Sequence, residues 1–80
     1  MDIKVKTFAG LKELLGGEIV VNMPKSSTIE DLERKILSIS PESERLLSIS
    51  AFVVDDSIVE KEFSLIENSL VYLLPPCSGG

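Results

Sequence analysis

The chain has 80 residues, of which 44% are hydrophobic, so it has room for one domain with one core. Its formal net charge of −5 repels phosphate backbones, and nucleic acid is therefore not expected as a partner. The sequence has no run of about 18 apolar residues, and its first ten residues lack the pattern of a signal peptide, which predicts no membrane partner and a cytoplasmic location.

The first predicted element is a strand from Asp2 to Phe8. Lysines alternate there with apolar or small residues, and a period of two is typical of a half-buried strand. The residues on its inward side are Ile3, Val5 and Thr7. Leucines at helical spacing then predict one or two helical turns before the pair Gly16-Gly17. The run from Glu18 to Met23 predicts a second strand, antiparallel to the first.

The clearest helix signal follows the second strand. Thr28 with Asp31, or Ser27 with Glu30, fits a capping box, in which a side-chain oxygen accepts from an otherwise unpaired amide. Apolar residues then recur at steps of three and four, at Ile29, Leu32, Ile36 and Ile39. This one-sided stripe predicts a helix packed on one face of a sheet. Pro41 is expected to end the helix, because the residue before a proline is biased toward extended conformations.

The segment from Pro41 to Ser50 fits either a continued helical turn or a polar loop, and both alternatives stay open. The next residues predict a hairpin, with the β-prone run AFVV at 51–54, a turn at 55–57 and a short strand at 58–59. The connection that follows offers three apolar side chains to the core, Phe63, Leu65 and Ile66. The apolar run from Leu70 to Leu74 predicts a last strand in the middle of the sheet.

Together these elements predict an α+β domain, with a mixed sheet of four or five strands and one main helix packed on one face. The first and last strands are the longest and most apolar, so we expect them side by side at the centre. The domain would span residues 1–74. Residues 75–80 would form a flexible C-terminal tail that ends in Gly79-Gly80.

The inventory of reactive side chains is small. The chain has no histidine, no cluster of residues at metal-ligand spacing and no nucleophile paired with a base, so we expect no metal site and little catalysis by the chain alone. The single cysteine, Cys77, has no neighbouring base or cation that would lower its pKa. We therefore interpret it as a small residue of the tail rather than a sulfur relay.

The tail itself has a physical logic. Pro75 and Pro76 fix φ and carry no amide hydrogen, so they end a sheet ladder and project the following residues outward. Glycine lacks a Cβ, so Gly79 and Gly80 can thread a narrow channel and present an unhindered carboxylate. From Pro75 to Gly80 the reach is about 20 Å at roughly 3.3 Å per residue. This length is sufficient to enter the active site of another protein.

Four segments carry a resemblance to a known family: IKVKTFAGLKELLG, SSTIEDL, LVYLLPP and the final Ser78-Gly79-Gly80. They resemble the ubiquitin-like β-grasp sulfur carriers, and among these the small subunit of molybdopterin synthase, over essentially the whole chain. The resemblance implies that an ATP-dependent, E1-like activating enzyme adenylates the Gly80 carboxylate, which becomes a thiocarboxylate. It also implies that the sulfur passes to a pterin in the large subunit of the synthase. ATP would be used by the activating partner, and this chain would bind no cofactor.

The resemblance also implies roles for individual residues. Gly80 would bear the reacting carboxylate, Gly79 would keep the passage narrow, and the two prolines would set the exit direction. The residues that match family positions facing the large subunit are Phe8, Leu11, Lys12, Leu73 and Leu74. Phe8 and the leucines also fit a role in the core, and Lys12 also fits a solvated surface lysine.

Two departures from the family pattern leave the partner open. The acidic-Gly-acidic turn before the last strand is replaced here by Glu67-Asn68-Ser69, although Asn68 can still adopt a positive φ. The final aromatic pair is replaced by Leu73-Leu74. Two alternatives therefore remain, a ubiquitin-like protein modifier conjugated through Gly80 and a sulfur carrier for thiamine or another sulfur-containing product.

Overall fold

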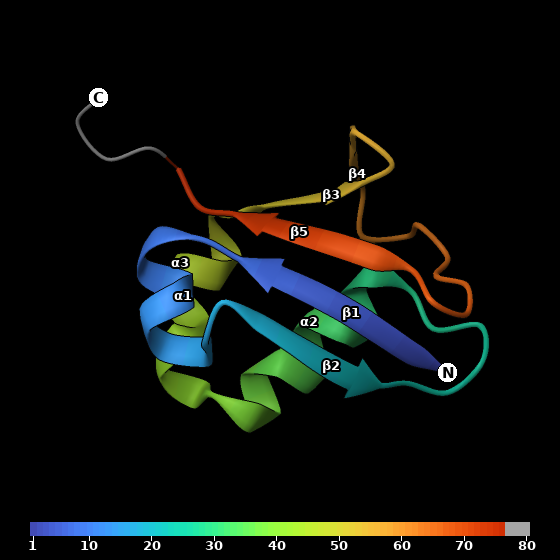
Figure 1. Cartoon of the computed structure of the whole chain (residues 1–80), viewed down its shortest axis with the longest axis horizontal. Coiled ribbons are helices and arrows are strands. Elements are labelled where there is room, and N and C mark those ends of the chain that lie inside the picture. The colour runs from blue at the N-terminus through green and yellow to red at the C-terminus, as the bar shows by residue number, and fades with distance from the viewer. Residues whose placement is uncertain (77–80) are drawn as a thin grey trace.

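Five strands form one mixed sheet in the computed structural model, which describes residues 1–76 (Figure 1). The strands are β1 (Asp2–Thr7), β2 (Glu18–Asn22), β3 (Ala51–Val54), β4 (Ser57–Val59) and β5 (Leu70–Leu74). Their order across the sheet is β2-β1-β5-β3-β4. β1 is parallel to β5, and the other neighbouring pairs are antiparallel. The prediction that the first and last strands lie side by side is therefore confirmed.

The helices lie on one face of this sheet (Figure 1). They are α1 (Ala9–Leu15), α2 (Ile29–Ile39) and α3 (Glu44–Ser48), with a short 3-10 helix at Pro41–Ser43 between the last two. Of the two alternatives for residues 41–50, the helical one is therefore correct. This arrangement is the β-grasp fold of ubiquitin-like proteins, as the sequence predicted.

The core lies between the sheet and α2. All three inward residues predicted for β1 are buried, and Ile29, Leu32 and Ile36 of α2 are fully buried. The fourth residue of the α2 stripe, Ile39, is 57% exposed, so its predicted place in the core is wrong. It belongs to the last turn of the helix, where it lines a surface hollow beside β2 instead of packing beneath the sheet.

The connection between β4 and β5 corrects a second prediction. Leu65 is buried, but Phe63 and Ile66 are exposed. The carbonyl of Phe63 accepts a hydrogen bond from the Ile29 amide at 3.0 Å, so this residue supports the start of α2 through its backbone. Ile66 begins a turn closed by its hydrogen bonds with Ser69, and its side chain points to solvent. Only Leu65 of the three predicted core residues therefore reaches the core.

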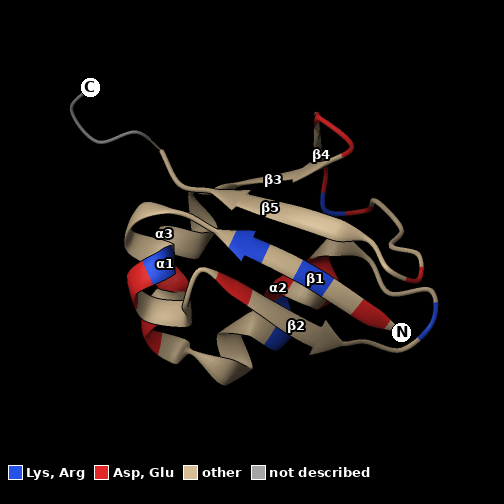
Figure 2. Ribbon diagram, viewed as in Figure 1, with Lys and Arg blue, Asp and Glu red and all other residues tan. Residues whose placement is uncertain are grey.

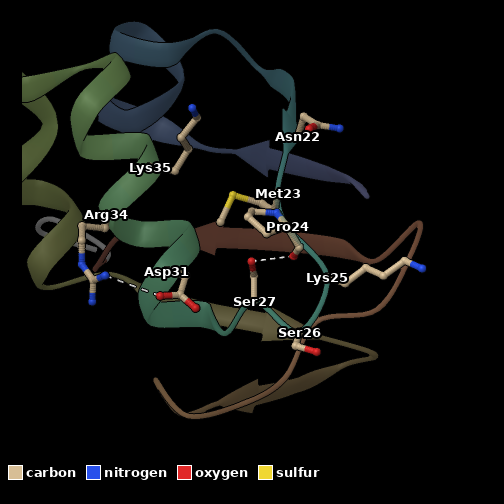
Figure 3. A pocket seen from close by; sticks show the side chains of 9 residues that line it. All are labelled: Asn22, Met23, Pro24, Lys25, Ser26, Ser27, Asp31, Arg34 and Lys35. Carbon is tan, nitrogen blue, oxygen red and sulfur yellow. Dashed lines mark hydrogen bonds and ion pairs between the residues drawn. The ribbon is translucent and has the colours of Figure 1, made fainter.

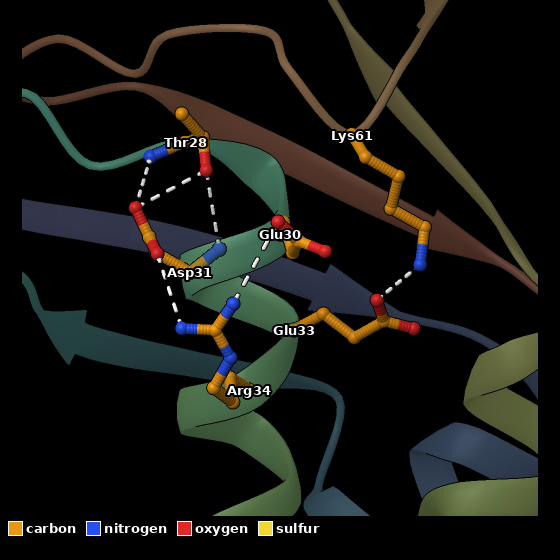
Figure 4. A network of polar contacts seen from close by, with 6 residues as sticks. All are labelled: Thr28, Glu30, Asp31, Glu33, Arg34 and Lys61. Carbon is orange, nitrogen blue, oxygen red and sulfur yellow. Dashed lines mark hydrogen bonds and ion pairs between the residues drawn. The ribbon is translucent and has the colours of Figure 1, made fainter.

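The start of α2 has the predicted capping box of Thr28 and Asp31 (Figure 4). Thr28 Oγ1 accepts from the Asp31 amide at 3.3 Å, and Asp31 Oδ2 accepts from the Thr28 amide at 2.9 Å. Ser27 does not cap the helix, because its hydroxyl donates to the Pro24 carbonyl at 2.7 Å. An ion pair between Lys61 and Glu33 ties the loop after β4 to the same helix (Figure 4).

Element boundaries differ from the predicted ones by at most one residue. Phe8 was predicted as the last residue of the first strand, but it lies outside β1 and is the extended residue directly before α1. Gly16, with a φ of 88°, ends α1 in a conformation that favours glycine. Asn68 has a φ of 65°, so it adopts the predicted positive φ in the turn before β5.

No helix within residues 1–76 is long and apolar enough to cross a membrane, and the cytoplasmic location stays a prediction.

Candidate functional site: the exit of the last strand

β5 ends in the middle of the sheet, where it is paired with β1 on one side and with β3 on the other. Leu73 is in register with Thr7 of β1, and Leu74 is in register with Ala51 of β3. Pro75 and Pro76 follow directly and cannot donate to either ladder, so the sheet pairing of this strand ends at Leu74. The predicted site residues Gly79 and Gly80, and also Cys77, lie outside the described residues, and their roles stay predictions.

The structure divides the five predicted interface residues into two groups. The side chains of Leu11 and Leu73 are fully buried in the core. They cannot contact a partner directly, so we remove them from the candidate interface and retain their alternative interpretation as core residues. Phe8, Lys12 and Leu74 are exposed and remain available.

The retained residues lie around the exit of β5. In the parallel register, Thr7 pairs with Leu73, so the next residue, Phe8, follows β1 at the level of Leu74. Figure 1 shows the end of β5 beside the turn from β1 into α1. The amide of Lys12 donates to the Phe8 carbonyl at 3.3 Å, which places Lys12 one helical turn beyond Phe8.

An aromatic pair supports this surface. The rings of Phe8 and Tyr72 are stacked, with centroids 5.8 Å apart and planes inclined by 22°. Sequence reasoning did not single out Tyr72. The signal was available, because alternation along β5 places Tyr72 and Leu74 on the face opposite Leu73.

More apolar side chains extend the surface across the sheet. Val53 of β3 pairs with Tyr72 on one side and with Ile58 of β4 on the other, so all three share the open face of the sheet. We define the open-face patch as Phe8, Val53, Ile58, Tyr72 and Leu74. β3 and β5 carry no charged residue, while β1 beside β5 carries lysines and the turn between β3 and β4 carries Asp55 and Asp56 (Figure 2). The exit is therefore an apolar surface with lysines on its β1 side.

The described residues hold no cluster of histidine, cysteine or carboxylate groups that could bind a metal ion. The pKa of Asp31 is lowered because its carboxylate accepts hydrogen bonds from the backbone and side chain of Thr28, with a smaller contribution from Arg34. This carboxylate belongs to the cap of α2, so its shift has a structural cause. Neither observation places a reactive group among the described residues at the exit of β5.

A family model described as the ThiS family matches residues 5–80. The chain belongs to the ThiS family. Because the match runs to residue 80, this ThiS-family chain shares with the family model the segment that contains Gly79 and Gly80. A comparison with curated protein sequences returns no match.

Solved structures similar to this ThiS-family chain share its fold at low sequence identity. SAMP1 of Haloferax volcanii, small archaeal modifier protein 1, is 20% identical with a TM-score of 0.87, and the match covers 100% of both chains. A putative molybdopterin converting factor subunit 1 of Pyrococcus furiosus is 21% identical with a TM-score of 0.87, covering 96% of this chain and 99% of that one.

A third similar structure is a complex of two proteins. It contains subunits 1 and 2 of the molybdopterin-converting factor of Helicobacter pylori 26695, and the matched chain is 21% identical with a TM-score of 0.72 over 100% of both chains. At such identities these likenesses show the fold alone. Together with the family match, they confirm the resemblance to ubiquitin-like β-grasp sulfur carriers that the sequence indicated.

Proposed function

We propose that this chain is the sulfur-carrying small subunit of a molybdopterin synthase and holds sulfur as a thiocarboxylate on Gly80. The observation that carries the proposal is the family match, which extends through residue 80 and includes Gly79 and Gly80. The similarity to a putative molybdopterin converting factor subunit 1, and to a complex of subunits 1 and 2, supports this choice of acceptor. The proposal requires a free carboxylate on Gly80.

In the proposed reaction, the carboxylate of Gly80 attacks the α-phosphorus of ATP on an activating enzyme, and pyrophosphate leaves. A sulfur nucleophile at the oxidation level of sulfide then displaces AMP and leaves a thiocarboxylate. The catalytic groups would belong to the partners. This chain would supply the carboxylate, a tail without Cβ atoms at its end, and β5 as the anchor from which the tail begins.

The large subunit would dock on the open-face patch. Phe8 and Leu74 expose apolar surface beside the point where the chain leaves β5, so a partner bound there would receive the tail directly. Apolar and aromatic residues are typical anchors of protein interfaces. Lys12, one turn along α1 from Phe8, would pair with an acidic group at the rim.

A loading experiment tests the role of Gly80. The purified chain is incubated with its activating enzyme, ATP and a sulfide source, and thiocarboxylate formation is followed by intact mass. Deletion of Gly80 should abolish loading and leave the backbone NMR spectrum of residues 1–76 unchanged. The matched control Cys77→Ser should load fully, because we assign Cys77 no part in the transfer. Full loading of the deletion variant would refute the proposal.

A second function is favoured by one observation, the similarity to the small archaeal modifier protein over the whole chain. In that case the amine of a target lysine would attack the activated Gly80 carboxyl, forming an isopeptide bond and releasing AMP. We would then expect lysine-linked conjugates of the chain in the native cell, and no complex with a pterin-binding enzyme. A carrier for thiamine or another product would share the loading step and differ in the acceptor that co-purifies.

A further inference from the structure

A groove follows the outer edge of β2, between this strand and α2. A hollow of about 300 Å³ forms one end and is lined by residues of α1, β2 and the end of α2. A hollow of about 500 Å³ forms the other end, where β2 leads into the loop before α2 (Figure 3). Val21 and Ile39 line the first hollow. The second hollow is lined by Asn22, which follows Val21 in β2, and by Lys35, which lies one helical turn before Ile39. The two hollows lie at successive positions along β2 and α2, and we call them together the β2 groove.

The backbone of β2 has unused hydrogen-bonding groups along this groove. The Thr7 amide donates to the Gly17 carbonyl at 3.0 Å, and the Met23 amide donates to the Met1 carbonyl at 2.8 Å. In an antiparallel pair such bonded residues alternate with residues whose amide and carbonyl point outward. The outward groups belong to Glu18, Val20 and Asn22, and no backbone hydrogen bond between described residues uses them. β2 thus presents an open edge to any additional strand.

The end of the groove near α1 is apolar. Leu14, Val20 and Ile39 line it, and each exposes more than a third of its surface. Ser40 also lines this hollow, and only 3% of its surface is exposed. Its hydroxyl is the one buried side-chain polar group of residues 1–76 that has no hydrogen-bond partner. The exposed apolar side chains at this end favour an apolar occupant.

The end near the loop before α2 is basic. Lys25, Arg34 and Lys35 line this hollow, with Asp31 the one acidic residue among them (Figure 3). Arg34 is paired with Glu30 at 3.6 Å and with Asp31 at 3.5 Å. Lys25 and Lys35 make no ion pair with any described residue. In a chain with a net charge of −5, this end favours an acidic ligand.

We propose that the β2 groove binds an extended segment of a partner protein, which adds to the sheet next to β2. Its apolar side chains would enter the hollow lined by Leu14 and Ile39, and acidic residues at one of its ends would face Lys25 and Lys35. Main-chain bonds would supply affinity, while the apolar and basic ends would supply specificity. This inference goes beyond the sulfur-carrier function, because neither Gly80 nor the open-face patch takes part.

The charge pattern favours such a segment over a second copy of the chain. Pairing of β2 with its own copy would bring a strand whose single charged residue is Glu18. Two unpaired lysines are better matched by a cluster of acidic residues. An extended apolar segment followed by several carboxylates provides that cluster.

The experiment titrates the full-length, ¹⁵N-labelled chain with a synthetic peptide of four alternating valine and isoleucine residues followed by three aspartates. We expect chemical-shift changes along residues 18–22 and α2, and slower hydrogen exchange at the amides of Val20 and Asn22. A control peptide with three lysines in place of the aspartates should bind at least about tenfold more weakly. Absence of any change on β2 with the acidic peptide at about millimolar concentration would overturn the proposal.

Two pairs of variants locate the binding. Val20→Pro removes an outward amide without breaking a bond to β1 and should abolish binding, while Val20→Thr keeps the amide and should retain it. Lys35→Glu should weaken binding by about five- to tenfold, and Arg45→Glu, with the same charge change on α3, should not. The second pair remains informative if Val20→Pro does not fold.

Two results would defeat the assignment. One is binding of the acidic peptide that persists unchanged in Val20→Pro and Lys35→Glu. The other is a homodimer in sedimentation experiments that Val20→Pro dissociates, because the edge would then be occupied by a second copy. A monomer that binds the acidic peptide through β2 supports the proposal.

Discussion

The two faces of β5 differ in what they contact, although they alternate along a single strand. Val71 and Leu73 are fully buried under the helices, whereas Leu70, Tyr72 and Leu74 reach the open face, where Leu74 is 39% exposed. The covered face fixes the strand in the core. The open face presents apolar surface beside the exit of the chain. The difference implies that stability and partner binding can be changed separately by substituting neighbouring residues.

The largest effect is expected for a substitution on the covered face of β5. Leu73→Ala should lower the free energy of unfolding by about 2–5 kcal/mol, because it removes buried methyl groups and leaves a cavity. Leu74→Ala should lower it by less than about 1 kcal/mol, since its side chain is partly in solvent. Urea denaturation of both variants checks the contrast. Equal losses in the two variants would show that the faces do not differ in this way.

A smaller effect is expected at the helix that covers the sheet. Thr28→Ala should lower the free energy of unfolding by about 1 kcal/mol, because it removes the acceptor for the Asp31 amide. Thr28→Ser keeps the hydroxyl and should lose much less. Urea denaturation measures stability, and calorimetric titration with the large subunit measures binding. A large loss of binding in Thr28→Ala would mean that the open face depends on this cap.

On the open face, Phe8→Ala should cost about 0.5–1.5 kcal/mol of stability, because the stack with Tyr72 is lost. Phe8→Tyr keeps a ring at this position and serves as the control. Binding to the large subunit should weaken in the alanine variant by more than stability alone explains. Unchanged affinity, measured by calorimetric titration, would remove Phe8 from the proposed interface.

The smallest expected effect is a pH dependence at Asp31. Its pKa is lowered in the folded protein from the ordinary value of 3.8 by the hydrogen bonds from Thr28. The stabilisation by this carboxylate is therefore complete above that value and is lost as the pH falls through the lower folded-state pKa. The difference in unfolding free energy between the native chain and Asp31→Asn should shrink between neutral pH and about pH 3. A constant difference in urea denaturation at both pH values would contradict this assignment.

Local patterns were sufficient to predict most of the fold. The alternation in β1, the capping box before α2 and the apolar run of β5 each involve residues that are close in sequence, and all three predictions are confirmed. The pairing of β1 with β5 followed from their apolar character. Patterns of this kind are set by local backbone preferences and by the period of the element.

The errors concern contacts between segments distant in sequence. Leu11 of α1 is fully buried, and α1 also lies very close to α3, since a Cβ on Gly10 would be 2.7 Å from Leu46 Cδ2. The stack of Phe8 on Tyr72 and the open edge of β2 also depend on strand order and register. No local periodicity contains that information. The roles of Gly79 and Gly80 remain predictions, because they depend on chemistry performed with partners.

The central claim is that Gly80 carries sulfur, and intact mass of the protein isolated from its native cell tests it most directly. The proposal predicts a species in which one oxygen of the terminal carboxylate is replaced by sulfur, together with a co-purifying pterin-binding subunit. Lysine-linked conjugates of the chain, with no sulfur-bearing species and no pterin enzyme, would contradict it.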